Sequence, residues 1–135
     1  MTVTPINPES LHRNPAFSQA IAIDGPHRTV YVGGQNAVDV DGNVVGRDDV
    51  AAQAGQVARN LQAALEAAGA TMDDVVKLTV YLVEPNSAFP AYETFQRVWG
   101  MPANPPTISL LYVSGLFQPD FLLEVDAVAV LPRIP

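Results

Sequence analysis

The hydrophobic residues of this chain follow two different periods, and the longer period indicates a helix near its middle. Between positions 49 and 68, apolar residues recur at steps of three and four, as on one face of an α-helix. We expect Asp48 to cap this helix and Gly69 to end it in a left-handed conformation. The apolar face consists of Val50, Ala54, Val57, Leu61, Ala64, Leu65 and Ala68. The other face, which we expect to meet solvent, carries Gln53, Gln56, Arg59, Asn60 and Glu66.

A second helix is predicted from about Ala88 to Trp99. Ser87 can cap its start, and Pro90 falls in the first turn, where a missing N–H costs little. Its apolar residues, which share one side, are Ala88, Tyr92, Phe95 and Trp99.

β-Branched and aromatic runs predict the strands, while residues 1–16 are expected to be irregular. The turn Asp24-Gly25-Pro26 suggests that the first two strands pair as a hairpin. The predicted strands are 17–23, 28–32, 75–83, 107–113 and 121–131. The order β-β-α-β-α-β-β predicts a single α+β domain over residues 1–135, with both helices on one face of a mixed sheet.

Composition narrows the classes of partner. The chain has 135 residues, 48% of them hydrophobic and 16% charged, so it can form a core and also bury surface between subunits. Its net charge of −7 and its seven basic residues argue against binding to nucleic acid or to anionic membranes. It has no cysteine, no metal-ligand spacing and no apolar run of the roughly 20 residues that a membrane helix needs. We therefore expect a cytoplasmic protein without metal or cofactor.

The best candidate for chemistry is Glu124, an acid inside the apolar run 121–131. A carboxylate in such a strand is costly unless it is paired, hydrogen-bonded or used. Glu124 is therefore either a general base that orients water or a structural group that accepts hydrogen bonds from backbone amides. Asp126 lies two residues further on and would share its face. Either the two like charges raise one pKa, or Asp126 reaches solvent or a basic residue, and we favour the latter.

Four segments together resemble the Rid family, the reactive-intermediate deaminases also called the YjgF or L-PSP type. They are Pro15-Ala-Phe-Ser-Gln-Ala20, Val32-Gly-Gly-Gln35, the run Gly69 to Leu82, and Leu123-Glu-Val-Asp-Ala-Val-Ala129. The resemblance implies a chorismate-mutase-like fold and a homotrimer with a central barrel and ligand clefts between subunits. It also implies hydrolysis of small imines or enamines, in which an arginine binds the substrate carboxylate and a glutamate positions water.

Matched position by position, Glu124 corresponds to the family glutamate, but Thr107 stands where the arginine would be. Threonine has no guanidinium group, so ordinary 2-iminopropanoate deamination is not expected. Whether a neighbouring subunit replaces the arginine, for example with Arg13 or Arg97, stays open. The other positions assigned to substrate binding are Phe17, Gly33, Gly34, Phe89 and Ser109.

The sequence therefore supports two hypotheses from different classes. The first is a homotrimer that binds a small, neutral or apolar metabolite and hydrolyses a C–N bond through Glu124 and water. The second is a non-catalytic ligand-binding or chaperone-like trimer, which the apolar pocket replacements favour. A ribonuclease, suggested by the older family name, is disfavoured by the acidic charge.

Overall fold

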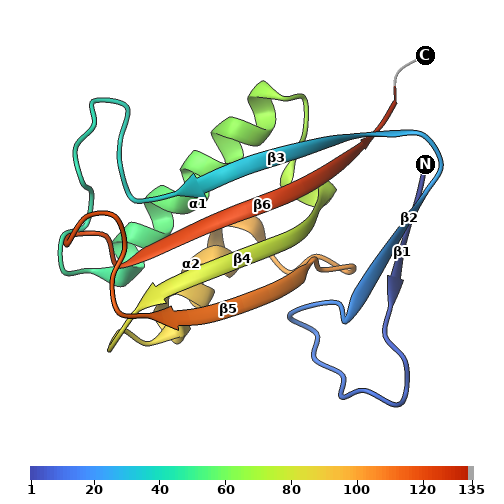
Figure 1. Ribbon diagram of the computed structural model, residues 1–135, viewed down its shortest axis with the longest axis horizontal. Helices are drawn as coiled ribbons and strands as arrows, with labels where there is room; N and C mark the ends of the chain where they lie inside the picture. The colour runs from blue at the N-terminus through green and yellow to red at the C-terminus, as the bar shows by residue number, and fades with distance from the viewer. Residues whose placement is uncertain (134–135) are drawn as a thin grey trace.

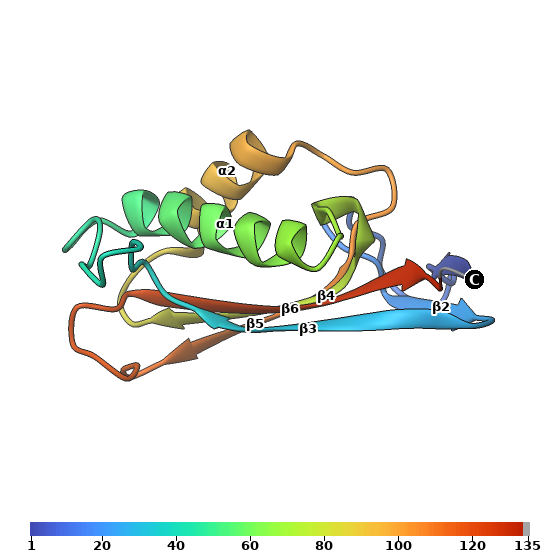
Figure 2. The ribbon, with the colours of Figure 1, turned by 90° about the horizontal axis from the view of Figure 1, so that it is seen from above.

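The computed structural model describes residues 1–133, and its main layer is a four-stranded mixed sheet (Figure 1). The strands lie in the order β3-β6-β4-β5, with β6 antiparallel to both of its neighbours and β4 parallel to β5. Figure 2 shows both helices on one face of this sheet. The α+β class and the helix placement predicted from the sequence are confirmed. The bounds are β3 His27–Gln35, α1 Val50–Ala67, β4 Val75–Val83, α2 Ala88–Trp99, β5 Thr107–Val113 and β6 Leu123–Pro132.

The two helices serve as crossovers between parallel strands. Helix α1 and the short 3-10 turn η1 (Met72–Asp74) connect β3 to β4, and α2 connects β4 to β5. Parallel strands need such long connections, which place the helices on a sheet face. Helix α2 begins where the sequence predicted, because the Ser87 hydroxyl accepts a hydrogen bond from the Phe89 N–H at 3.3 Å.

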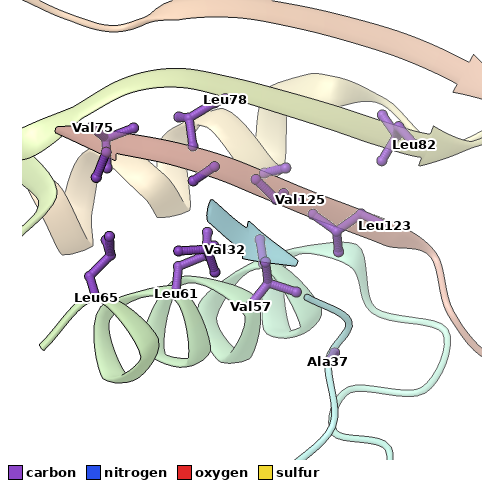
Figure 3. Close-up of a cluster of buried hydrophobic side chains, with 14 of the residues drawn as sticks. Val32, Ala37, Val57, Leu61, Leu65, Val75, Leu78, Leu82, Leu123 and Val125 are labelled. Carbon is purple, nitrogen blue, oxygen red and sulfur yellow. The ribbon is translucent and has the colours of Figure 1, made fainter. Parts of the chain in front are cut away.

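The core lies between α1 and the sheet (Figure 3). Leu61 and Leu65 of α1 are fully buried, and Val32 of β3 faces them across the core in the close-up. Alternate residues of β6 point to the same side because successive side chains of a strand face opposite ways. These buried β6 residues are Leu123, Val125, Ala127 and Ala129. The residues between them must therefore face the sheet side that carries no helix.

The expected hairpin near the N-terminus is wrong. Residues 2–6 form a strand, β1 (Thr2–Ile6), which pairs antiparallel with β2 (Ala20–Asp24) in a separate two-stranded sheet. Strand β3 pairs with β6 instead, and Val32 of β3 is buried in the core under α1. Residues 1–16 are thus not wholly irregular, and β2 begins three residues later than predicted.

Two expectations about α1 also need correction. Asp49, not Asp48, caps the helix, because its carboxylate accepts from the Ala52 N–H at 3.1 Å while Asp48 has a positive φ of 59°. Gln53, which was placed on the solvent face, is completely buried. Its amide donates to the carbonyls of Gly46 and Asp120 and accepts from the Leu122 N–H. This side chain therefore attaches α1 to the segment that enters β6.

Candidate functional site

Glu124 lies on the face of the sheet that is opposite to the helices. Its neighbours along β6, Leu123 and Val125, are fully buried under α1, so strand alternation directs Glu124 the other way. The side chain is half-buried between β3 and β4, and its register partner on β4 is Tyr81. This position leaves the carboxylate accessible to a ligand on the open face.

Asn36 holds the Glu124 carboxylate from one side. Its side-chain amide donates to Glu124 Oε1 at 3.2 Å and to the Leu123 carbonyl oxygen at 3.3 Å. The backbone of Asn36 is fixed in turn by Asn60 of α1, whose Nδ2 donates to the carbonyl oxygens of Asn36 and Val38 at 3.0 and 2.9 Å. A neutral amide therefore orients one carboxylate oxygen and leaves the charge of Glu124 uncompensated.

Gly34 makes room for the same carboxylate. A Cβ atom at position 34 would clash with Glu124 Oε2 and would lie 2.7 Å from its Cδ. The register of β3 against β6 shifts between Val32 and Gln35, as at a β-bulge. By contrast, a Cβ atom at Gly33 would meet nothing within 4 Å. Of the two glycines, Gly34 is therefore the one that shapes the space around Glu124.

Asp126 and Tyr81 extend the polar region along the open face. In the register of β4 and β6, Asp126 pairs with Thr79. This pair lies two residues along each strand from the pair of Glu124 and Tyr81. The negative charge of Asp126 raises the pKa of Tyr81 above its ordinary value, with smaller contributions from partial burial, a hydrogen bond to Asp126 and the charge of Glu124. The two acids thus act on a tyrosine hydroxyl that sequence analysis did not single out.

No basic side chain pairs with Glu124 within residues 1–133, where the one ion pair joins Arg47 to Asp120 at 2.5 Å. The same part of the chain holds no group of three or more potential ligands able to bind a metal ion. None of its helices combines the length and apolarity needed to cross a membrane.

Thr107 and Ser109 lie on β5, away from Glu124 within one chain. Across β4, Thr107 is level with Lys77 and Val128, whereas Glu124 is level with Tyr81 and Leu111. Thr107 is therefore four residues, roughly 13 Å, further along the sheet. Its hydroxyl also donates to the Val76 carbonyl oxygen at 2.8 Å. Ser109 is closer, because it shares the level of Thr79 and Asp126.

The two aromatic candidates lie in other places. Phe17 packs edge-on against His12, and the adjacent Ser18 donates its hydroxyl proton to the Pro105 carbonyl at 2.5 Å, close to the start of β5. Phe89 is 64% exposed at the beginning of α2, where it lines a cavity on the helix side of the sheet. A single chain therefore brings together Glu124 and Gly34, but not Phe17, Phe89 or Thr107.

Comparison with known proteins identifies the family. The family model of endoribonuclease L-PSP matches residues 8–131, nearly the whole chain. The chain belongs to this family. Glu124, the Gly33-Gly34 segment and both helices all fall inside the matched range of this L-PSP family member.

The relatives of this L-PSP family member include proteins of the Rid group. A RutC family protein of Pyrococcus abyssi is 34% identical over 113 residues, 84% of each chain. The 2-iminobutanoate/2-iminopropanoate deaminase of Rattus norvegicus is 33% identical over 115 residues, 85% of this chain and 80% of its own. The crystal structure of YyfB, a Rid family protein of Yersinia pestis, has a TM-score of 0.84 at 36% identity and covers 97% of this chain and 100% of its own. The Rid resemblance found in the sequence is confirmed.

Asn36 and Tyr81 are the site residues that sequence reasoning missed. Asn36 directly follows the Gly-Gly-Gln segment, but nothing local connects it with a glutamate 88 positions later. That contact depends on β3 lying beside β6, which the expected hairpin did not predict. Tyr81 was predicted to be in a strand, but its position opposite Glu124 depends on the register of β4 against β6.

Proposed function

We propose that this member of the L-PSP family hydrolyses the C–N bond of small imines or enamines that carry no carboxylate, with Glu124 positioning the attacking water. The observation that carries the proposal is the geometry around Glu124. Its carboxylate is half-buried, oriented by Asn36 and without a basic partner among the described residues. A carboxylate held in this way can accept a proton from water.

The chemistry needs one water and no redox partner. Glu124 accepts a proton as the water oxygen forms a bond to the imine carbon. The π electrons of the C=N bond move to the nitrogen, which takes a proton from solvent to give the carbinolamine. The C–N bond then breaks as the nitrogen takes the proton held by Glu124 and leaves as ammonia, while the hydroxyl group loses its proton to solvent and becomes the carbonyl. General base catalysis of this kind contributes about 10²- to 10⁴-fold to a rate. The relatedness to a 2-iminobutanoate/2-iminopropanoate deaminase supports this class of reaction.

The charge of the site argues for a neutral substrate. A substrate carboxylate is bound best by an arginine fork, and Thr107, at the position of the family arginine, has its hydroxyl engaged by Val76. On the open face, Glu124 and Asp126 would repel an anion instead. We therefore infer that imines without a carboxylate are turned over faster than 2-iminopropanoate.

We further propose that the complete site forms between protomers of a homotrimer. The candidate residues of one chain lie toward opposite edges of the sheet. Glu124 and Gly34 lie near the β3 edge, whereas Thr107 and Phe17 lie near the start of β5, at the other edge. Joining the β3 side of one protomer to the β5 side of the next would bring the two groups together. Light scattering coupled to size-exclusion chromatography tests this, and a monomer at micromolar concentration would contradict it.

The decisive experiment compares substrates of different charge. L-amino-acid oxidase supplies 2-iminopropanoate from alanine, and an amine oxidase supplies neutral imines from simple amines. We expect the protein to accelerate loss of the neutral imines, and Glu124→Gln to reduce that acceleration about a hundredfold. Rapid turnover of 2-iminopropanoate that Glu124→Gln abolishes would refute the substrate assignment and restore the ordinary deaminase activity.

The second candidate function is a non-catalytic binding protein. It is favoured by the engaged hydroxyl of Thr107, which leaves the site with few free polar groups on β5. In that case no imine loss exceeds the uncatalysed rate, and Glu124→Gln changes nothing. Loss of turnover in a variant that keeps the wild-type oligomeric state supports the enzyme.

A further inference from the structure

A large apolar cavity lies on the side of the sheet opposite to Glu124. It has a volume of about 380 Å³ and lies between α2, strands β4 and β5, and the proline-rich segment that follows α2. Leu78 and Val80, which contribute to its floor, point to the helix side, whereas their neighbours Thr79 and Tyr81 point to the open face. The cavity and the Glu124 site are therefore separated by the thickness of the sheet.

The walls of the cavity are almost entirely hydrocarbon and aromatic. Its principal wall residues are Leu78, Val80, Phe95, Trp99, Ile108 and Leu110. Phe95 and Trp99 pack edge-to-face with ring centroids 4.7 Å apart, so one side of the cavity is a fixed aromatic surface. Protein interiors contain few voids larger than a water molecule, whereas small-molecule pockets span about 300–1,000 Å³. The size and the apolar walls are those of a ligand pocket.

A second hollow of opposite character adjoins the cavity. The two share Pro15, Met101, Pro102 and Pro105 as common walls. The second hollow contains one arginine, Arg13, and no acidic residue. The one acid that lines the apolar cavity, Asp73, is exposed to solvent. The chain has a net charge of −7, so a hollow lined by one positive charge and no acid differs in charge from the chain as a whole.

Asn7, Asn14 and the solvent-exposed Arg13 supply hydrogen-bond donors to this second hollow, whose polar lining also includes Ser18 and Asn104. Asn7 and Asn14 use their Oδ1 atoms to accept from the backbone N–H groups of Gln19 and Ala16, at 3.0 and 2.9 Å. Their NH₂ groups and the Arg13 guanidinium have no hydrogen-bond partner among the residues that the structure describes. Amide and guanidinium donors around one space complement an anionic oxygen group.

We propose that these two adjoining spaces form a second binding site, for an amphipathic carboxylate. The apolar body of the ligand lies between α2 and β4–β5, and its carboxylate lies beside Arg13, Asn7 and Asn14. Within one chain, the cavity that would hold the apolar body lies on the face of the sheet opposite to Glu124.

Trp99 provides a direct measurement, since it is the only tryptophan of the chain and lines the cavity. Octanoate, octanol and octylammonium share one tail and differ in the charge of the head group, so each is titrated against the full-length protein while tryptophan fluorescence is recorded. We expect saturable binding of octanoate, about fivefold or more tighter than octanol, with octylammonium weakest. Equal affinity for the three probes, or no saturable change with octanoate, would overturn the proposal.

Arg13→Gln tests the head-group contact. We expect it to lower the affinity for octanoate about fivefold, to the level of octanol, and to leave octanol unchanged. Arg133→Gln, which removes the same charge from an exposed position near the C-terminus, is the matched control and should bind octanoate like the wild type. An equal loss in both variants would mean that only the net charge matters, which would contradict the site.

Filling the cavity tests the location of the tail. Ala88→Phe and Ile108→Phe each add volume to a wall residue, from α2 and from β5. We expect either variant that keeps the wild-type circular dichroism spectrum to lose octanoate binding. Undiminished binding in a folded variant would place the ligand elsewhere.

Discussion

The carboxylate of Glu124 occupies the space that a side chain at position 34 would need. A Cβ atom there would lie 2.7 Å from Glu124 Cδ and closer still to Oε2. The glycine in β3 and the acid in β6 are thus one steric unit, although 90 positions separate them in the sequence. The Gly-Gly segment therefore determines where the carboxylate can be.

Gly34→Ala should separate the position of Glu124 from the stability of the fold. The added methyl meets the flexible end of a side chain, so we expect the free energy of unfolding to change by only about 1 kcal/mol. Displacement of the carboxylate should lower Glu124-dependent imine hydrolysis about tenfold to a hundredfold. Gly115→Ala is the control, since a Cβ atom there meets nothing within 4 Å. Unchanged kinetics in Gly34→Ala would show that the carboxylate has room elsewhere.

Asn36→Leu tests the orientation of the same carboxylate. It removes the amide that donates to Glu124 Oε1, and a hydrogen bond to a charged group is worth about 1.5–3 kcal/mol. We expect kcat to fall roughly tenfold, and Asn36→Gln, which keeps an amide donor, to retain more activity. Asn43→Leu, at an exposed turn, serves as the matched control. Equal activity of the leucine and glutamine variants at position 36, at similar thermal stability, would argue against a positioning role.

Tyr81 should ionise late, and Asp126 should be the main reason. Because the pKa of Tyr81 is raised chiefly by Asp126 and least by Glu124, Asp126→Asn should lower it more than Glu124→Gln does. The chain has four tyrosines. Subtracting the phenolate absorbance titration of Tyr81→Phe from that of the wild type gives the titration of Tyr81 alone. If Glu124→Gln lowered the pKa of Tyr81 more than Asp126→Asn does, the prediction that Asp126 contributes more than Glu124 would be wrong.

The same raised pKa has a consequence for stability in alkali. A raised pKa in the folded state means that folding favours the neutral phenol, so this contribution is complete below the ordinary tyrosine pKa of about 10. It is lost as the pH rises through the raised value, because the unfolded chain releases the proton first. The free energy of unfolding should therefore decline above about pH 10, and Tyr81→Phe should reduce the slope. Denaturant unfolding at several pH values measures it.

Gln53→Leu should be the most destabilising of these changes. The substitution keeps the volume but leaves two partly buried carbonyl groups and the Leu122 N–H without their partner, at about 1 kcal/mol each. We expect a loss of about 3 kcal/mol and a melting temperature lower by roughly 10 °C. Gln62 lies on the same helix, and its side chain makes no hydrogen bond among the described residues. Gln62→Leu should therefore change the melting temperature little.

The sequence predicted the elements better than the pairings between them. The apolar period predicted α1 and α2 to within a residue or two, because periodicity is a local property. The pairing of β2 with β1 and of β3 with β6 depends on which strand fills the layer under α1, and the turn at Gly25 carries no information on that. Gln53 was assigned to the solvent face because it is polar, yet it is buried, and its amide forms hydrogen bonds with backbone groups that are distant in the sequence.

The candidate site could be predicted only in part for the same reason. Glu124 was identifiable because a charge interrupts an apolar strand, which is visible in the sequence itself. Asn36 and Tyr81 become relevant only through strand registers that bring them beside Glu124. The assignments of Phe17, Gly33, Phe89, Thr107 and Ser109 came from resemblance and stay predictions.

Strands β3 and β5 form the two edges of the main sheet, each with a hydrogen-bonded neighbour on one side only. Their outer backbone groups can template pairing with another chain, and β5 also exposes Leu111 and Tyr112. A protein that satisfies such edges by self-association acquires a melting temperature that rises with its concentration. In the proposed homotrimer, dilution should therefore lower the melting temperature.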